Sequence, residues 1–325
     1  MRRASPGIVF LDAATYGDSR LDSFTHKWKC AIYPATTADQ TIPRLAGHSI
    51  AVTNKVVIDK TVFNAREARD LNLIVVAATG TDIIDREEAA RRGIQVRNVP
   101  GYATQSVAQF TLALILELAT HAGSYVDAVK AGEWQKSQVF SLLAFPAIEL
   151  GEKKLGIVGH GSIGQAVARM ARGFGMEILV AARPGSAGPM PQDRIALNQL
   201  LREADFVSLH CPLTPQTRNL IDEHSLALMK PTAFLINTAR GALVDEAALI
   251  DALGKKRIAG AALDVITQEP PAADHPMILA AKDLDNLILT PHTAWSAREA
   301  RERLLYEVEE NIRAFLQGED RNRVA

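Results

Sequence analysis

The sequence has few cysteines and almost no net charge. Its 2 cysteines, Cys30 and Cys211, lie far apart and lack metal-ligand spacing, so we expect neither a disulfide nor a metal site. We expect both to be buried apolar side chains in a reducing compartment. The 36 basic and 37 acidic residues give a net charge of -1, which provides no electrostatic reason to expect nucleic acid or an anionic membrane as a partner.

Long apolar runs are also missing. The most apolar segment, around Phe110 to Ala119, contains Glu117 and falls short of a membrane span. The run from Gly7 to Leu11 is too short for the core of a signal peptide and is typical of a first strand. These absences predict a cytoplasmic protein without a membrane partner, whose function lies in a pocket.

The clearest positive feature is a glycine-rich turn within Leu155 to Val167. A strand-like run leads into Gly159, Gly161 and Gly164, and helical spacing follows. This order is typical of a dinucleotide-binding turn, in which the first glycine permits the turn, the second admits a pyrophosphate and the third lets the helix pack on its strand. A purely structural glycine turn is the alternative, and the strand-like segment Glu177 to Val180 argues against it.

The end of that second strand indicates the cofactor. In NAD-binding proteins an acidic side chain there usually accepts a hydrogen bond from the ribose 2′-hydroxyl, whereas this chain has Ala182 and Arg183. No acidic side chain is therefore present to repel a 2′-phosphate. Arg183 could hold that phosphate by charge-assisted bonds, which contribute about 1.5–3 kcal/mol. The sequence therefore predicts a preference for NADP(H), with NAD(H) still possible; a solvated loop arginine is the alternative.

Alternating strand-like and helix-like segments predict an α/β protein with two Rossmann-like, doubly wound parallel-sheet domains. In the first part of the chain, Leu73 to Ala77 is continuous enough to be central in a parallel sheet. The other strand candidates, besides those at Leu155 and Glu177, are Ser49–Thr53, Ile94–Val96, Phe206–Leu209, Ala233–Ile236, Ala259–Leu263 and Leu287–Leu289.

Helix ends can be placed as well. Asp85 with Glu88 resembles a capping box, and Gly93 is placed to end that helix. Thr104 or Ser106 can cap a long helix that begins near Val107 and runs past His121. We expect a charged amphipathic helix from Ser296 to Gln317 to pack back on the first domain.

Polar residues gather where the later strands end, at His210–Thr214, Asn237–Gly241, Asp264–Pro270 and Thr290–Trp295. Among them, Arg240, Glu269 and His292 suit hydride transfer to a 2-keto acid. A guanidinium can hold the carboxylate and polarise the carbonyl, an imidazolium can donate the proton, and a carboxylate can keep the imidazole charged. Taken singly, each has a structural alternative: a surface charge, a turn residue before Pro270 and a core histidine.

Together with Ala78–Asp82 and the glycine turn, these motifs resemble the D-isomer-specific 2-hydroxyacid dehydrogenase family over nearly the whole chain. The resemblance implies that Arg240, Glu269 and His292 are catalytic and that Asp264 lies near the nicotinamide carboxamide. It further implies a dinucleotide-binding domain, residues 102–290, inserted in a substrate domain formed by residues 1–101 and 291–325. Homodimers form through the cofactor domain in this family.

The residues expected at the two binding sites follow from the turn, the strand ends and the resemblance. The loop Ala78–Thr81 leaves a strand end where open α/β sheets bind ligands, although an ordinary loop is the alternative. Expected cofactor contacts are Thr104, Gly159, Gly161, Ser162, Ile163, Gly164, Arg183, His210, Cys211, Pro212, Thr217, Thr238, Ala239, Asp264 and His292. Expected substrate contacts are Ala78, Thr79, Gly80, Arg240, His292 and Trp295.

The segment His292–Trp295, with Thr53–Lys55, is similar to the hydroxypyruvate reductase or glycerate dehydrogenase branch of the family. We predict reduction of hydroxypyruvate or glyoxylate to D-glycerate or glycolate by hydride transfer from NADPH or NADH, with His292 protonating the forming alkoxide. Two alternatives stay open: a bulkier 2-keto acid, and a nucleotide-sensing corepressor of the same family.

Overall fold

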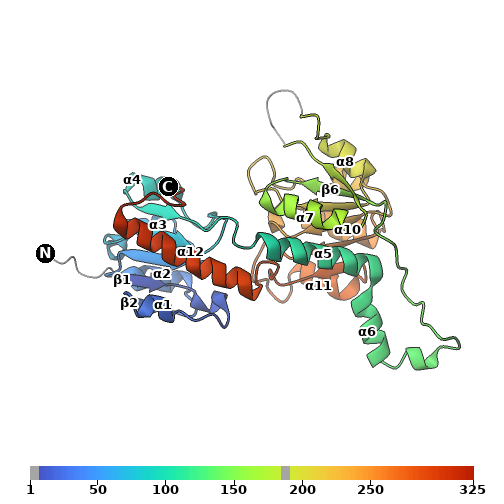
Figure 1. The fold of residues 1–325 in the computed structure, drawn as a ribbon, viewed down its shortest axis with the longest axis horizontal. Helices are drawn as coiled ribbons and strands as arrows, with labels where there is room; N and C mark the ends of the chain where they lie inside the picture. The colour runs from blue at the N-terminus through green and yellow to red at the C-terminus, as the bar shows by residue number, and fades with distance from the viewer. Residues whose placement is uncertain (1–6, 184–190) are drawn as a thin grey trace. The chain divides into compact units, whose positions relative to one another are not determined.

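The chain folds into two compact α/β units (Figure 1). The structure is a computed structural model, and it describes residues 7–183 and 191–325. The outer unit combines Met1–Ala103 with Ser296–Ala325, and the inserted unit is Thr104–Trp295. One unit is thus inserted in the sequence of the other, as the resemblance implied. The boundaries between the units fall after residues 103 and 295, which is two and five residues beyond the boundaries expected after residues 101 and 290.

The outer unit contains a five-stranded parallel sheet. Its order is β2 (Lys29–Ile32), β1 (Gly7–Phe10), β3 (Ile50–Thr53), β4 (Leu73–Val76) and β5 (Gln95–Arg97). The run at Leu73 is interior, as expected, although β3 holds the middle of the sheet. The edge strand β2 was not predicted, because it is only partly buried and lacks a continuous apolar run. Cys30 lies on it and is only half-buried, so the expectation that both cysteines are buried holds for Cys211 alone.

The helices of the outer unit include one contributed by the end of the chain. The C-terminal helix α12 (Arg298–Gln317) packs on β4 (Figure 1). Its buried residues Ala300, Leu304, Val308 and Ile312 recur every fourth position, which places one apolar stripe against the sheet. The predicted return of this helix to the first domain is confirmed. The remaining helices are η1 (Ala13–Tyr16), α1 (Asp22–Thr25), α2 (Ala38–Leu45), α3 (Lys60–Asn64), η2 (Arg66–Ala68) and α4 (Arg86–Arg91).

The start of α4 corrects one expectation. The Asp85 side chain accepts from the amide of Glu88 at 2.9 Å, but Glu88 does not complete a capping box. Its buried carboxylate instead pairs with Arg91 and Arg92, because two guanidinium groups within the next helical turn compete with the backbone amide. Gly93, at φ +70°, follows the end of the helix as predicted.

The inserted unit contains a six-stranded parallel sheet, as predicted. Its order is β11 (Leu287–Leu289), β10 (Gly260–Leu263), β9 (Phe234–Asn237), β8 (Phe206–Leu209), β6 (Lys154–Val158) and β7 (Glu177–Val180). The strands β8 and β10 are buried throughout, because helices cover both faces of a doubly wound sheet. From β6 the chain moves outward to β7 and then returns to the other side at β8, and such a switch point is where open α/β sheets bind ligands.

The first helix of the inserted unit differs from its prediction. Helix α5 (Thr104–Thr120) begins at Thr104 rather than near Val107 and ends before His121, whose φ of +53° breaks it from α6 (Ala122–Lys130). Ser106 does not cap it; its hydroxyl donates to the Ala294 carbonyl at 2.6 Å. The other helices are η3 (Trp134–Lys136), α7 (Ser162–Arg172), α8 (Leu197–Glu203), α9 (Glu223–Leu228), η4 (Gly241–Leu243), α10 (Glu246–Gly254) and α11 (Pro276–Asp283).

In the described ranges, no single helix has the length and apolar character to cross a membrane. The pair α5 and α6, bent by 62° at their junction, meets the length and composition criteria together. Much of α5 is buried inside the inserted unit, where it packs on α7.

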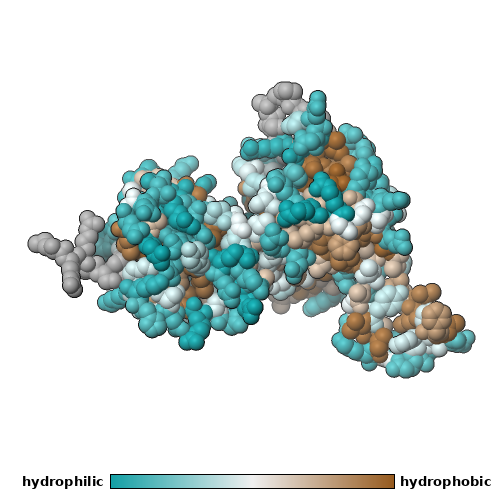
Figure 2. All heavy atoms as spheres, in the orientation of Figure 1, coloured by the Kyte–Doolittle hydropathy of each residue, from teal (hydrophilic) through white to brown (hydrophobic). Residues whose placement is uncertain are grey.

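An apolar arm extends from the inserted unit. It consists of α6 and the segment 131–149, which contains η3 and is otherwise irregular. Figure 2 shows apolar residues gathered on its surface. Its exposed large apolar side chains include Val139, Phe140 and Leu143, which are 65%, 92% and 88% exposed. Exposure of neighbouring large apolar side chains is typical of a surface that another molecule covers.

Candidate active site

The carboxyl ends of five strands in the inserted unit are in register. Val158 of β6, Leu209 of β8, Asn237 of β9, Leu263 of β10 and Leu289 of β11 form one row of paired residues. The residue after each strand therefore leaves the same edge of the sheet. This register explains why the polar segments found in the sequence come together.

The glycine turn has the geometry that its sequence predicted. Gly159 has φ +100°, and a Cβ there would lie 2.4 Å from the amide nitrogen of Cys211. A Cβ on Gly164 would lie 2.2 Å from the Gly159 carbonyl oxygen, whereas one on Gly161 would meet nothing within 4 Å. The first and third glycines thus allow tight packing, and the second leaves open space.

The first turn of α7 suits an anion. Gly161 is its N-cap and supplies no side-chain hydrogen bond to the free amides. Ser162 is exposed and Ile163 is half-buried against the core. Uncapped amides and the helix dipole favour a phosphate group at this end.

The end of β7 carries basic rather than acidic side chains. Ala182 donates its amide to the Ile195 carbonyl at 2.8 Å, which fixes the backbone next to the exposed Arg183. Residues 184–190, which follow Arg183, lie outside the described residues. Nearby, Arg194 contacts Nδ1 of His160 at 3.2 Å. Desolvation and Arg194 lower the pKa of His160, so this part of the turn is positively charged through its arginine.

His210 begins the loop after β8 as a neutral imidazole. Its Nε2 lies 2.9 Å from the Ser208 hydroxyl, and burial lowers its pKa to about 3. Cys211 is buried beside Gly159, and burial raises the pKa of its thiol to about 11. Neither group titrates near neutral pH, so neither suits proton transfer.

The rest of that loop is fixed by one hydroxyl. Thr217 is buried, accepts from the Thr214 amide at 2.7 Å and donates to the Pro212 carbonyl at 2.8 Å. These bonds place Pro212 at the carboxyl edge of the sheet.

The loop after β9 is held by a residue that sequence reasoning did not single out for this role. The side chain of Asn237 accepts from the Ala239 amide at 3.0 Å and donates to the Arg240 carbonyl at 2.8 Å. Thr238 is buried and its hydroxyl lies 2.9 Å from that of Thr111 on α5. Asn237 thus sets the backbone from which the Arg240 guanidinium extends, and its place at a strand end was the only sign in the sequence.

Asp264 organises the loop that carries His292. One carboxylate oxygen accepts from the Thr290 hydroxyl at 2.6 Å and from the Thr293 amide at 2.9 Å, and the other accepts from the Ala294 amide at 2.8 Å. Burial raises the pKa of Asp264, and these three donors oppose that rise. The sequence implied a cofactor contact for Asp264; the structure adds a role within the chain, and Thr290 is the partner that was missed.

His292 and Glu269 lie within ion-pair distance of each other at the carboxyl edge of the sheet. Nδ1 of His292 lies 2.5 Å from Oε2 of Glu269, and the two side chains are 23% and 29% exposed. The other Glu269 oxygen accepts from the Ile266 amide at 3.0 Å. His292 has a backbone φ of +51°, a conformation that is uncommon for residues other than glycine. With Nδ1 bound to the carboxylate, Nε2 is the nitrogen left for a reacting group.

The expected substrate residues are divided between the two units. Arg240, His292 and the half-buried Trp295 belong to the inserted unit. Ala78, Thr79 and Gly80 follow β4 in the outer unit, where the Thr79 hydroxyl donates to the Val99 carbonyl at 3.0 Å. The Thr79 carbonyl in turn accepts from the Asn98 side chain at 2.7 Å, so the loop has a defined backbone.

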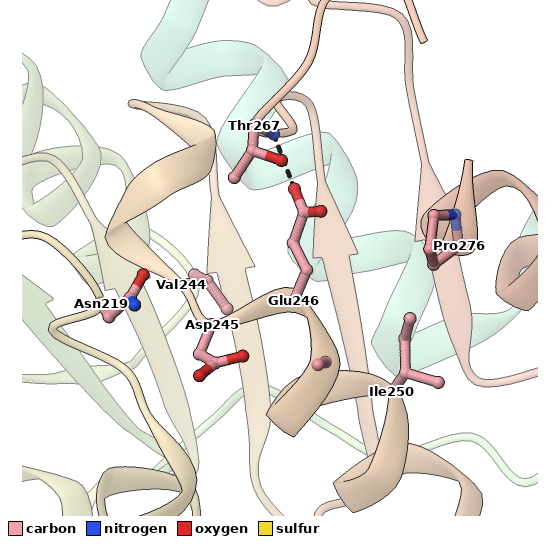
Figure 3. A pocket seen from close by; sticks show the side chains of 8 residues that line it. Asn219, Val244, Asp245, Glu246, Ile250, Thr267 and Pro276 are labelled. Carbon is pink, nitrogen blue, oxygen red and sulfur yellow. Dashed lines mark hydrogen bonds between the residues drawn. The ribbon is translucent and has the colours of Figure 1, made fainter. Parts of the chain in front are cut away.

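A cavity of about 480 Å³ lies beside the start of α10 (Figure 3). It is lined by residues at the start of α10, with Asn219, Thr267 and Pro276. None of the predicted site residues lines it, so it is separate from the predicted reaction site. Figure 3 shows the Glu246 carboxylate crossing it toward Thr267.

The chain has two doubly wound sheets, and one of them bears a dinucleotide turn and a His–Glu pair at the same edge. This combination is typical of two-domain dinucleotide-binding oxidoreductases. A sequence profile of the D-isomer specific 2-hydroxyacid dehydrogenase, NAD binding domain, matches residues 112–294. The chain is 39% identical over 318 residues to the glycerate dehydrogenase of Methylorubrum extorquens, covering 97% of this chain and 98% of that one. It is 43% identical over 272 residues to the glyoxylate reductase of Thermococcus litoralis, covering 82% and 80%.

Solved structures agree with the sequence comparison. An acyclic imino acid reductase in complex with NADPH and D-Arg matches with a TM-score of 0.83 and 30% identity, covering 98% of this chain and all of that one. The chain therefore belongs to the D-isomer specific 2-hydroxyacid dehydrogenase family, and it is an enzyme of that family. The family and fold predicted from the sequence are confirmed, whereas the roles of individual site residues stay predictions.

Proposed function

We propose that the enzyme reduces hydroxypyruvate or glyoxylate to D-glycerate or glycolate, with NADPH as the preferred reductant. The observation that carries the proposal is the 2.5 Å contact between His292 and Glu269 at the carboxyl edge of the sheet. A carboxylate on Nδ1 orients the imidazole and leaves Nε2 for a reacting group, and the reduction of a carbonyl requires a proton donor there. The glycerate dehydrogenase and glyoxylate reductase among the relatives support these two substrates.

The residues around the glycine turn fit a dinucleotide. The open space at Gly161 and the uncapped amides of α7 would hold the pyrophosphate. Toward the edge of the sheet we assign Thr104, Pro212, Thr238, Ala239 and Asp264 to its contacts. The bound nicotinamide supplies the hydride.

The chain's own residues would bind the substrate and move the proton. Arg240 would hold the carboxylate and polarise the keto group, and its side chain is steadied by an Nη1 bond to the Ala239 carbonyl at 2.8 Å. His292 would give the proton on Nε2 to the forming alkoxide, while Glu269 holds Nδ1. The Ala78–Gly80 loop and Trp295 stay proposed substrate contacts.

The preference for NADPH rests on the end of β7. Ala182 offers no carboxylate to a ribose 2′-hydroxyl and Arg183 supplies a cation, and the NADPH-bound imino acid reductase is consistent with this choice. The free cysteines, Cys30 and Cys211, suit a reducing compartment, and we place the enzyme in the cytoplasm.

Initial rates of NADPH and NADH oxidation with hydroxypyruvate, glyoxylate, pyruvate and phenylpyruvate test the proposal. We expect one of the first two to be the best substrate with NADPH. Arg183→Ala should reduce the NADPH to NADH ratio of kcat/KM by about ten- to a hundredfold, the equivalent of one charge-assisted contact. Arg202→Ala, an exposed arginine on α8, is the matched control and should leave the ratio unchanged.

Other outcomes point elsewhere. Best turnover of phenylpyruvate would establish a bulkier substrate, and tight nucleotide binding without any turnover would favour a nucleotide-sensing role. Equal efficiency with both cofactors would contradict the NADPH preference.

We further propose a homodimer formed through the inserted unit, with the apolar arm as its interface. The support is the exposure of Val139, Phe140 and Leu143, because a second copy would remove this apolar surface from water.

A further inference from the structure

The loop that carries Glu269 is fixed by the segment that follows Arg240. A Cβ on Gly241 would lie 2.0 Å from the carbonyl carbon of Ile266, so the two backbones are in direct contact. The next amide along the loop, that of Thr267, donates to Oε1 of Glu246 at 2.6 Å (Figure 3). Two consecutive amides are therefore bound by two carboxylates, because the amide of Ile266 donates to Glu269 itself.

Glu246 is not needed by its own helix. It is the first residue of α10, and the N-cap Asp245 already accepts from the Ala248 amide at 3.1 Å. Glu223 occupies the same position in α9, after its N-cap Asp222, and its side chain is 77% exposed. The Glu246 side chain is only 14% exposed, because it turns away from solvent to reach the loop.

The second oxygen of Glu246 faces a buried histidine. Oε2 lies 3.8 Å from Nε2 of His275, which is 9% exposed. Nδ1 of His275 accepts from the Met277 amide at 3.3 Å, so a neutral ring carries its proton on Nε2, the nitrogen nearest Glu246. The carboxylate is thereby held between the start of α11 and the Glu269 loop.

We propose that Glu246 is a positioning residue for the reaction. It does not meet the reacting atoms; it fixes the Thr267 amide and so keeps the loop in the conformation from which Glu269 reaches His292. This inference rests on the proposed role of Glu269 and His292 in proton transfer. Loss of the tether lets the Glu269 carboxylate move away from Nδ1, and small displacements of a catalytic group cost large factors in rate.

Three variants test the proposal in the full-length enzyme. Glu246→Asp keeps the charge at the start of α10 but is one methylene too short to reach Thr267, whereas Glu246→Gln keeps an acceptor oxygen at full length. We expect Glu246→Asp to lower kcat for hydroxypyruvate or glyoxylate reduction by about ten- to a hundredfold with cofactor affinity unchanged. Glu246→Gln should retain most of the turnover. Glu223→Asp in α9 is the matched control and should behave as the parent enzyme.

A double-variant comparison separates positioning from a general loss of structure. Glu269→Gln removes the carboxylate that holds His292 and should lower kcat with cofactor affinity unchanged. Glu246→Asp should have no further effect on kcat in the Glu269→Gln background, because the two changes act through one contact.

The results that would overturn the inference also distinguish it from the proposed function. Full additivity of the two losses, or normal turnover of Glu246→Asp, would remove Glu246 from this role and leave the proposed function intact. Normal turnover of Glu269→Gln would refute the proposed proton transfer and the positioning role together.

Discussion

At the scale of single residues, the two histidines at the carboxyl edge of the sheet have different surroundings. His292 is partly exposed and paired with a carboxylate, whereas His210 is half-buried beside Ser208, and desolvation lowers its pKa to about 3. We expect the two histidines, in the loops after β11 and β8, to serve different purposes because their surroundings differ. The sequence alone could not assign these roles, since it places both histidines at strand ends without their partners.

His210 also makes stability depend on pH. Its folded pKa lies below the ordinary value of 6.5, so between these values the unfolded chain binds a proton that the folded protein does not. Stability should therefore be full above about pH 6.5 and fall as the pH is lowered toward about 3. Thermal unfolding of the cofactor-free enzyme should show a smaller loss on acidification for His210→Gln than for the parent.

The control for this measurement is His224→Gln, which removes an exposed histidine on α9. It should lose stability with acid as the parent does. If His210→Gln follows the parent as closely as this control, the imidazole is not kept neutral by burial.

At the scale of elements, periodic and apolar signals predicted most strands but not the breaks between helices. The six strands of the inserted unit were all expected, because each is a continuous apolar run beside a turn. The edge strand β2 was missed, and the end of α5 was placed too late, because the left-handed conformation of His121 leaves no trace in composition. The contacts of Asn237 were also beyond prediction because they depend on the conformation of its loop, and those of Thr290 and Glu246 because their partners lie more than twenty residues away in the sequence.

The apolar arm gives a testable consequence at this scale. Phe140→Ser with Leu143→Ser should convert the proposed dimer to a monomer at micromolar concentration, because each side chain would otherwise bury apolar area worth about 1.5–3 kcal/mol. Sedimentation velocity or light scattering measures the change. Tyr306→Ser, which removes a 62% exposed aromatic ring from α12 of the outer unit, should leave the oligomeric state unchanged. A parent enzyme that is already monomeric would refute the proposed interface.

At the scale of the whole molecule, three hydrophobic clusters each lie within one unit. The clusters around Leu235 and around Ile157 contain residues of the inserted unit alone, and the cluster around Ile74 and Val76 contains residues of the outer unit alone. Each unit thus has its own core, which is the usual condition for folding alone.

We therefore expect a fragment of residues 104–295 to fold without the rest of the chain. It should unfold cooperatively on heating and bind a nicotinamide dinucleotide, while having no reductase activity because the Ala78–Gly80 loop is missing. Circular dichroism and calorimetric titration provide the two measurements. As its matched control, Gly159→Ala in the fragment should abolish binding, since a Cβ there would lie 2.4 Å from the Cys211 amide. A fragment without cooperative unfolding would show that the inserted unit depends on its host.

The placement of α12 on β4 has a consequence for synthesis of the protein. The strand leaves the ribosome with the first part of the chain, but the helix that covers it is made only after the entire inserted unit. The inserted unit can finish folding during translation, whereas the apolar face beneath α12 waits until the last helix emerges. Nascent chains stalled before residue 298 should accordingly be the species that chaperones hold longest.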